Sequence, residues 1–391
     1  MKPIIILFLF CLILVSCKQT GNNNAVDTTT SFTKISEVKS FYKQFRGTIG
    51  TQPITLNLIK TTSAVDTNTT SFSGYFYYDN QEKPLPVYGI TDEKGYLNLD
   101  VWSRDGSESF FKGKQNADGI FAGTWSDTVS VKRQSLPFSL HEVYDNHTIR
   151  FNYIGFADSS ILFKGTKDSP KAMFVESVLT PVALTDKTLT GFLNKSFLTA
   201  EVPSYNLLDT TAVKNIPKIT YPDAAAKFKA ESAAYFKDYF ETMKEEKQGA
   251  DYNLNYNYAS LINVFYNTDN LLSIGESVET YTGGAHGMAV TNLNSYDLKT
   301  QKKLSLDDIF KPGYQPTVIA LLEKAIRLQQ NIKDNEPLNS VLFIDKMEVT
   351  DNFCVTRKGI LFLYNSDEIA SHAQGEFQLF IPFTDLKAVL K

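Results

Sequence analysis

The chain has 391 residues, 42% of them hydrophobic and 13% aromatic, and this length predicts two or three domains with packed cores. Its 39 basic and 43 acidic side chains give a formal net charge of −4. The sequence contains no stripe of lysine and arginine that would follow a phosphate backbone, and its longest basic cluster is the pair Lys302 and Lys303. The composition therefore argues against nucleic acid as a partner.

The first seventeen residues have the pattern of a lipoprotein signal peptide. Lys2 gives a positive start, residues 4–15 form a short apolar run, and Ser16 precedes Cys17. This run is too short for a transmembrane helix, which needs about 20 apolar residues. We expect cleavage before Cys17 and acylation of its sulfur, which would make the lipid bilayer a partner; an uncleaved anchor is the alternative. The absence of aspartate directly after Cys17 favours the outer membrane.

Residues 18–40 are rich in Thr, Asn, Ser and Gly and cannot bury enough apolar surface to fold. We expect them to form a flexible tether between the membrane and the globular part. Once the signal peptide is removed and Cys17 is modified, Cys354 is the only thiol left, so no internal disulfide is expected. Cys354 lies in a strand-like run, and we interpret it as a small buried hydrophobic residue.

Residues 41–145 alternate short apolar runs with turn sequences, which predicts an antiparallel all-β meander that closes into a small barrel or sandwich. Leu56 and Leu58 show the alternation, as do Phe72 and Phe76. The aromatic residues of this region have two interpretations. They line a ligand cup, or they build the core and cover the outer face, which we prefer. The residues in question are Trp102, Trp125, Tyr75, Tyr77, Tyr78, Tyr88 and Tyr96.

The rest of the chain mixes strand-like and helical segments, which predicts an α+β module with helices packed on an antiparallel sheet. Asp186 is a plausible cap of a short helix, and an aromatic stripe over residues 228–243 marks the clearest helix. A further helix with one apolar face is expected over residues 316–332. We divide this part into an α+β subdomain, residues 146–260, and a C-terminal α+β domain, residues 261–391.

A glycine-dense turn, Tyr281-Thr282-Gly283-Gly284-Ala285-His286-Gly287, lies between two of the strand-like runs. The paired glycines permit the positive φ angles that a hairpin turn needs. For His286 three roles are open: a catalytic residue, a metal ligand, or a residue that holds the turn by hydrogen bonds.

The four histidines include no His-x-x-x-His pair and no cysteine partner, so we expect no metal site. Ser371 stands beside His372, with Glu368 nearby, but these residues form no nucleophile elbow. We therefore prefer the structural role for His286 and assign no catalytic residue.

The glycine turn and three later segments together resemble the C-terminal domain of the bacterial envelope family found in lysozyme-sensing anti-sigma factors. The segments are Tyr-Asp-Leu-Lys-Thr at 296–300, Lys-Leu-Ser-Leu-Asp-Asp-Ile-Phe at 303–310, and Phe-Ile-Pro-Phe at 380–383. The same domain pair is similar to the non-catalytic N-terminal region of certain peptidoglycan deacetylases, so residues 146–260 resemble the deacetylase-associated domain. The resemblance covers residues 172–391. It implies an α+β extracytoplasmic module, which in the sensors binds lysozyme.

The chain also departs from this family. It shows no cytoplasmic sigma-binding segment, no spanning helix and no appended deacetylase domain. Where the family has a Tyr-Glu-Ile-Ala-Pro-Tyr-Ala-x-Gly pattern, residues 367–375 read Asp-Glu-Ile-Ala-Ser-His-Ala-Gln-Gly, so His372 replaces an aromatic residue.

We therefore expect a membrane-anchored envelope lipoprotein without a cofactor. Its function would be to bind or sense a cell-wall-related ligand, either a lysozyme-like protein or peptidoglycan. The alternative is a hydrolase of cell-wall or surface polymers that uses His286 or His372. The candidate binding or motif residues are Tyr281, Gly283, Gly284, His286 and His372.

Overall fold

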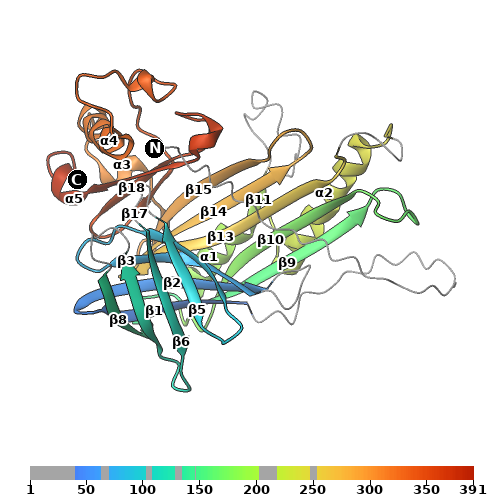
Figure 1. The fold of residues 1–391 in the computed structure, drawn as a ribbon, viewed down its shortest axis with the longest axis horizontal. Helices are drawn as coiled ribbons and strands as arrows, with labels where there is room; N and C mark the ends of the chain where they lie inside the picture. The colour runs from blue at the N-terminus through green and yellow to red at the C-terminus, as the bar shows by residue number, and fades with distance from the viewer. Residues whose placement is uncertain are drawn as a thin grey trace. The chain divides into compact units, whose positions relative to one another are not determined.

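The computed structural model describes the globular part of the chain (Figure 1). The described residues are 40–62, 70–102, 108–127, 134–145, 147–201, 218–246 and 253–391. The expected signal peptide with Cys17, nearly all of the expected tether, and the side chain of Trp102 lie outside them. Every helix within these ranges is too short or too polar to cross a bilayer.

The first eight strands form a closed barrel, in which each strand pairs antiparallel with the next and β8 pairs with β1. The strands are β1 Phe41–Ile49, β2 Gln52–Thr62, β3 Thr70–Tyr78, β4 Leu85–Thr91, β5 Leu97–Trp102, β6 Glu108–Gln115, β7 Phe121–Asp127 and β8 Gln134–Glu142. The prediction of an all-β region is confirmed. The sequence left a barrel and a sandwich open, and the structure is a barrel.

Apolar side chains fill the barrel. The inward residues of β2 are fully buried, and Phe111 packs edge to face against Phe76 and Phe138, with ring centroids 5.2 Å apart in each pair. Trp125 belongs to the same core. The described inward side chains therefore build a packed core and do not line a ligand cup. This agrees with the interpretation of the aromatic residues that we preferred.

A six-stranded sheet follows the barrel, in the order β16-β15-β14-β13-β10-β9. Its strands are β9 Phe151–Ile161, β10 Lys171–Pro181, β13 Tyr256–Thr268, β14 Leu271–Tyr281, β15 Met288–Asp297 and β16 Lys302–Lys303. Neighbours are antiparallel except β10 and β13, which run parallel. The expected antiparallel sheet is therefore a mixed sheet. Parallel pairing needs a long crossover connection, and the segment between β10 and β13 contains two helices.

These two helices are α1, Lys187–Leu198, and α2, Ala224–Thr242. Asp186 caps α1 as expected, because its carboxylate accepts hydrogen bonds from the backbone nitrogens of Thr188 (2.8 Å) and Leu189 (3.0 Å). The expected aromatic stripe of α2 is buried at Phe228 and packs against the strands β9 and β10. A two-stranded ladder of β11, Thr199–Glu201, and β12, Lys218–Thr220, lies between the helices in the sequence.

The C-terminal part has its own core between a three-stranded antiparallel sheet and short helices. Its elements are α3 Leu306–Ile309, α4 Gln315–Gln330, η1 Leu338–Ser340, β17 Phe353–Val355, β18 Gly359–Tyr364, η2 His372–Gln374, β19 Phe377–Pro382 and α5 Phe383–Leu386. Helix α4 corresponds to the helix expected over 316–332. It ends where Asn331 adopts a left-handed conformation with φ of 54°. Cys354 is fully buried on β17, as predicted.

The barrel docks on the six-stranded sheet through the outer face of β3. Tyr75 stacks on Phe265 of β13 with ring centroids 3.7 Å apart, and Tyr77 stacks on Tyr266 at 5.3 Å. The expected boundary between residues 260 and 261 falls within β13, and the division into domains stays a prediction.

A buried polar network joins the same two parts. The Gln44 amide nitrogen donates to the Asn267 carbonyl oxygen (2.7 Å), and the Asn267 amide nitrogen donates to the Tyr42 hydroxyl (3.0 Å). All three residues are buried, so these hydrogen bonds fix one orientation of the barrel on the sheet.

Candidate functional site

The glycine turn connects β14 to β15, and its glycines are required by its geometry. Gly283 and Gly284 have φ angles of 94° and 87°, a region that other residues rarely adopt. The Tyr281 hydroxyl donates to the Gly284 carbonyl oxygen (3.1 Å), which closes the turn. At Gly287 an added Cβ would lie 2.5 Å from the backbone oxygen of Thr280. Tyr281 and the glycines therefore shape the turn that carries His286.

A second loop, between β18 and β19, brings His372 to this turn. The imidazoles of His286 and His372 stack with ring centroids 4.1 Å apart and an interplanar angle of 23°. The Nδ1 atom of His372 lies 2.8 Å from Asp367 Oδ2, and Asp367 itself has a left-handed φ of 65°. The Nδ1 atom of His286 lies 3.0 Å from the Gly287 carbonyl oxygen.

These contacts leave the same atom of each ring available. Both Nδ1 atoms face oxygen atoms and act as donors, so in the neutral rings Nε2 is the acceptor. Within the described residues, neither Nε2 atom of His286 or His372 has a hydrogen-bond partner. The pair therefore presents two acceptors to a ligand.

Two side-chain amides, one in the second loop and one directly before β17, hydrogen-bond to β15. Asn365 Oδ1 accepts a hydrogen bond from the Thr291 backbone nitrogen (2.7 Å). Asn352 Oδ1 accepts from the Leu293 nitrogen (2.7 Å), and the Asn352 amide nitrogen donates to the Thr291 oxygen (2.7 Å). The two asparagines continue the β15 ladder in place of a further strand, so the histidine pair is held in position before any ligand binds.

Exposed apolar side chains lie next to the pair in the sequence. Met288 and Val290 are 44% and 36% exposed and share one face of β15, since side chains two apart in a strand point the same way. We call His286, His372, Met288 and Val290 the histidine surface. It combines hydrogen-bond acceptors with apolar contact area, the composition of a binding site for an amphipathic ligand.

The barrel contributes to the electrostatics near this end of the sheet. Burial, together with the charges of Glu376 and Glu279, raises the pKa of Tyr88 to about 12. Desolvation also raises the pKa of Glu279, which pairs with Ala289 across β14 and β15. The carboxylate of Glu279 is therefore an acidic group that the strand pairing places beside β15.

Neither a metal-binding group nor a nucleophile bonded to the histidines is found in the part of the chain that the structure describes. There, no group of three His, Cys, Asp or Glu side chains is arranged to hold a metal ion. The hydrogen bonds of those residues also connect neither imidazole to a serine, threonine or cysteine side chain, although Ser371 precedes His372 in the sequence. The structure brings His286 and His372 together, which sequence reasoning missed.

Two family models match this chain. Residues 174–289 match the model described as deacetylase PdaC, and residues 307–384 match the model described as a protein of unknown function, DUF3298. The peptidoglycan-N-acetylmuramic acid deacetylase PdaC of Bacillus subtilis (strain 168) is 28% identical over 113 residues, which are 28% of this chain. The match covers 24% of that deacetylase, so the chain spans about a quarter of the length of this curated relative.

Two solved structures of the DUF3298 family are also similar. The protein from Bacteroides fragilis is 24% identical, with a TM-score of 0.54 over 63% of this chain and 96% of its own. The protein from Pseudomonas aeruginosa is 18% identical, with a TM-score of 0.42 over 62% of this chain and 94% of its own. The likeness to the Bacteroides fragilis protein supports the fold.

The histidine pair joins the two matched regions, because His286 lies in the first and His372 in the second. The matches fit the resemblance to the non-catalytic region of peptidoglycan deacetylases, and they indicate a cell-wall-related module.

Proposed function

We propose that this protein is a cell-envelope module that binds peptidoglycan through the histidine surface. The observation that carries the proposal is the stack of His286 on His372, which joins the two matched regions at an exposed position. The name of the matched deacetylase supports peptidoglycan as the ligand over other polymers.

The chemistry of the surface suits a glycan that carries acetamido groups. Hydroxyl and amide hydrogens of such a glycan would donate to the two Nε2 atoms. Its methyl groups would contact Met288 and Val290, which are exposed on β15. Each neutral hydrogen bond contributes about 0.5–1.5 kcal/mol, so removing one imidazole should weaken binding about 2- to 10-fold.

The anchor and the location belong to the same proposal. Acylation of Cys17 would hold the module at the outer membrane. The resemblance to lysozyme-sensing proteins adds a lysozyme-like protein as an alternative ligand that the module would sense there. Replacement of Cys17 by serine should release the protein into the soluble fraction, and continued membrane association of that variant would refute acylation.

A hydrolase is the second candidate, and one contact favours it. A carboxylate that accepts a hydrogen bond from Nδ1 orients an imidazole as a general base, and Asp367 stands in this relation to His372. If the protein is a hydrolase, His372→Ala should abolish release of soluble fragments from sacculi while leaving sedimentation with them intact.

The test is co-sedimentation of residues 18–391 with purified sacculi and, separately, capture by immobilised lysozyme. His286→Ala and His372→Ala should each weaken binding to sacculi, whereas the matched control His141→Ala, at an exposed position on β8, should not. Equal binding by the wild type and both variants, with unchanged melting temperatures, would overturn the assignment of this surface. Binding to lysozyme alone would replace peptidoglycan with a protein ligand.

A further inference from the structure

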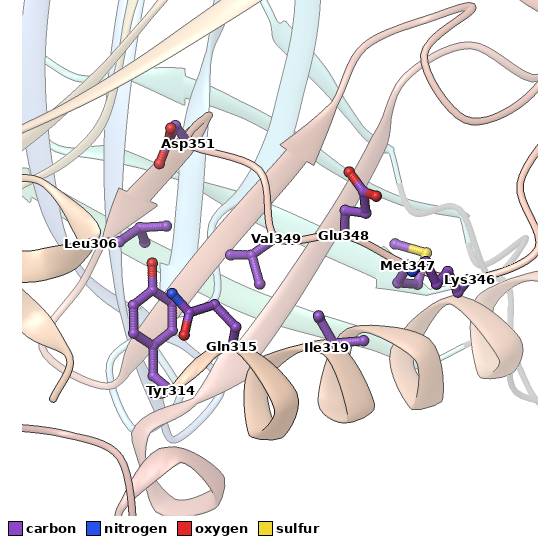
Figure 2. Close-up of a pocket in the computed structure, with 9 residues that line it drawn as sticks. All are labelled: Leu306, Tyr314, Gln315, Ile319, Lys346, Met347, Glu348, Val349 and Asp351. Carbon is purple, nitrogen blue, oxygen red and sulfur yellow. The ribbon is translucent and has the colours of Figure 1, made fainter. Parts of the chain in front are cut away.

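A pocket of about 440 Å³ lies between the start of α4 and the segment 346–351, among residues of the C-terminal core and not of the histidine surface (Figure 2). This volume is in the range of small-molecule sites. Its apolar part is formed by Leu306, Ile319, Met347 and Val349. The pocket therefore has a surface on which the body of a ligand can be desolvated.

Both walls of the pocket are held by the core. Tyr314, the residue before α4, stacks on Phe310 with ring centroids 4.7 Å apart and an interplanar angle of 19°. On the other side, the hydroxyl of the buried Tyr364 donates to the Glu348 carbonyl oxygen (2.5 Å). The pocket is therefore formed before a ligand arrives.

The pocket is lined by one tyrosine whose hydroxyl has no partner among the described residues. Tyr314 is only 7% exposed, yet its hydroxyl makes no hydrogen bond with any residue in the described part of the chain. Burial raises the pKa of Tyr314, and the charges of Asp307 and Asp351 raise it further, so the hydroxyl keeps its proton. Solvent reaches this hydroxyl through the pocket, and an acceptor on a ligand would take the place of that solvent.

The charged groups around the pocket are also uncommitted. Within the described ranges, the side chains of Gln315, Lys346, Glu348 and Asp351 form no hydrogen bond or ion pair. Figure 2 shows Asp351 and Lys346 at opposite ends of the pocket, with Val349 and Ile319 between them. Asp351 thus makes one end anionic, and the other end carries Lys346 together with Glu348.

We propose that this pocket binds short peptides that carry a free amino group at one end and a free carboxylate at the other. The ammonium group would lie near Asp351, and the carboxylate near Lys346. The Tyr314 hydroxyl would donate to a peptide carbonyl oxygen. The proposal does not rest on the histidine surface, none of whose residues lines the pocket. A free peptide carries both groups at its ends, whereas a stem peptide of peptidoglycan, whose amino end is joined to muramic acid, carries its free amino group on a side chain.

The test is calorimetric titration of residues 18–391 with the tripeptide L-lysyl-D-alanyl-D-alanine. Acetylation of its amino groups, or amidation of its carboxylate, should weaken binding about 5-fold or more, because each removes a charge-assisted hydrogen bond. Asp351→Asn and Lys346→Met should have comparable effects. Tyr314→Phe should weaken binding several-fold without lowering the melting temperature. The matched control Asp334→Asn, an exposed position outside the pocket, should bind normally.

The outcomes separate the two proposals. Absence of binding at millimolar tripeptide and muropeptide would overturn the pocket, as would binding that is insensitive to acetylation or to the pocket variants. Tighter binding of muropeptides than of the free tripeptide would support the site and identify the wall as the source, and equal binding would support it with free peptides as the source. His286→Ala should leave tripeptide binding unchanged, whatever it does to sacculus binding.

Discussion

Replacement of Lys227 by methionine is expected to destabilise the fold by about 3–5 kcal/mol, because it removes the cation that faces two buried carboxylates. Lys227 of α2 is 6% exposed, and its Nζ atom contacts Oε1 of Glu176 on β10, which is 2% exposed. The same Nζ atom lies 3.1 Å from Oε1 of Glu231, which is 5% exposed. Methionine has a similar length, so little of the loss would come from packing.

The magnitude follows from the burial of the partners. Removing one partner from a buried ion pair leaves an uncompensated charge, and in this cluster one lysine serves two carboxylates. Glu176 Oε2 is buried and has no hydrogen-bond partner among the described residues, so no other described donor would compensate the carboxylate charge once Lys227 is removed. Adding Glu176→Gln to Lys227→Met should recover more than half of the loss, because it removes the buried charge itself.

The assay is urea unfolding at pH 7, followed by both far-UV circular dichroism and tyrosine fluorescence, whose transitions must coincide for a free energy to be defined. Lys229→Met on the exposed side of the same helix is the control, and its effect should stay within about 0.5 kcal/mol. A loss below about 1 kcal/mol for Lys227→Met would refute the reasoning, since that is the range of exposed ion pairs. A double variant no more stable than the single one would do so as well.

Three further predictions concern buried groups. Burial raises the pKa of Glu231 in the folded state. The protonated side chain therefore contributes its whole stabilisation at a pH below the unfolded-state pKa of about 4.3, and this stabilisation is lost as the pH rises through the folded-state pKa. The stability of the wild type relative to Glu231→Gln should therefore fall over that window in urea titrations, and a constant difference would contradict the shift. Cys354 is fully buried, and burial raises the pKa of its thiol. A thiol reagent should therefore label the protein of residues 18–391 only after unfolding. Rapid labelling of the native form would contradict the burial of Cys354 in the core. Asn267→Ala should lower the free energy of unfolding by about 2–4 kcal/mol. The Asn267 side-chain amide hydrogen-bonds to both the backbone nitrogen (3.1 Å) and the backbone oxygen (2.7 Å) of the buried Ile149. An unchanged melting temperature in calorimetry would show that the network is dispensable.

The barrel could be predicted from the sequence because its signal is local. Alternation along β2 and β3 places Leu56 and Phe76 inside, and turn residues separate the strands at short intervals. The choice between barrel and sandwich could not be made, since it depends on the pairing of β8 with β1, whose residues are far apart in the chain.

The mixed sheet and the histidine pair depend on contacts of the same long-range kind. A strand pattern does not indicate its neighbour, so the parallel pairing of β10 with β13 was not predicted. For the site, the glycines identified the turn and its need for positive φ angles, and the choice of binding residues stays a prediction. The stacking of His286 on His372 has no local signal, because the two residues are 86 positions apart in the chain and belong to different loops.

The most direct test of peptidoglycan binding by the histidine surface is a double-mutant cycle on sacculus affinity. The variants are His286→Ala, His372→Ala and the double variant, each first shown to melt as the wild type does. If the stacked imidazoles act as one surface, the single losses should not add, and the coupling should be about 0.5–3 kcal/mol. Wild-type affinity in the double variant would contradict the proposed function.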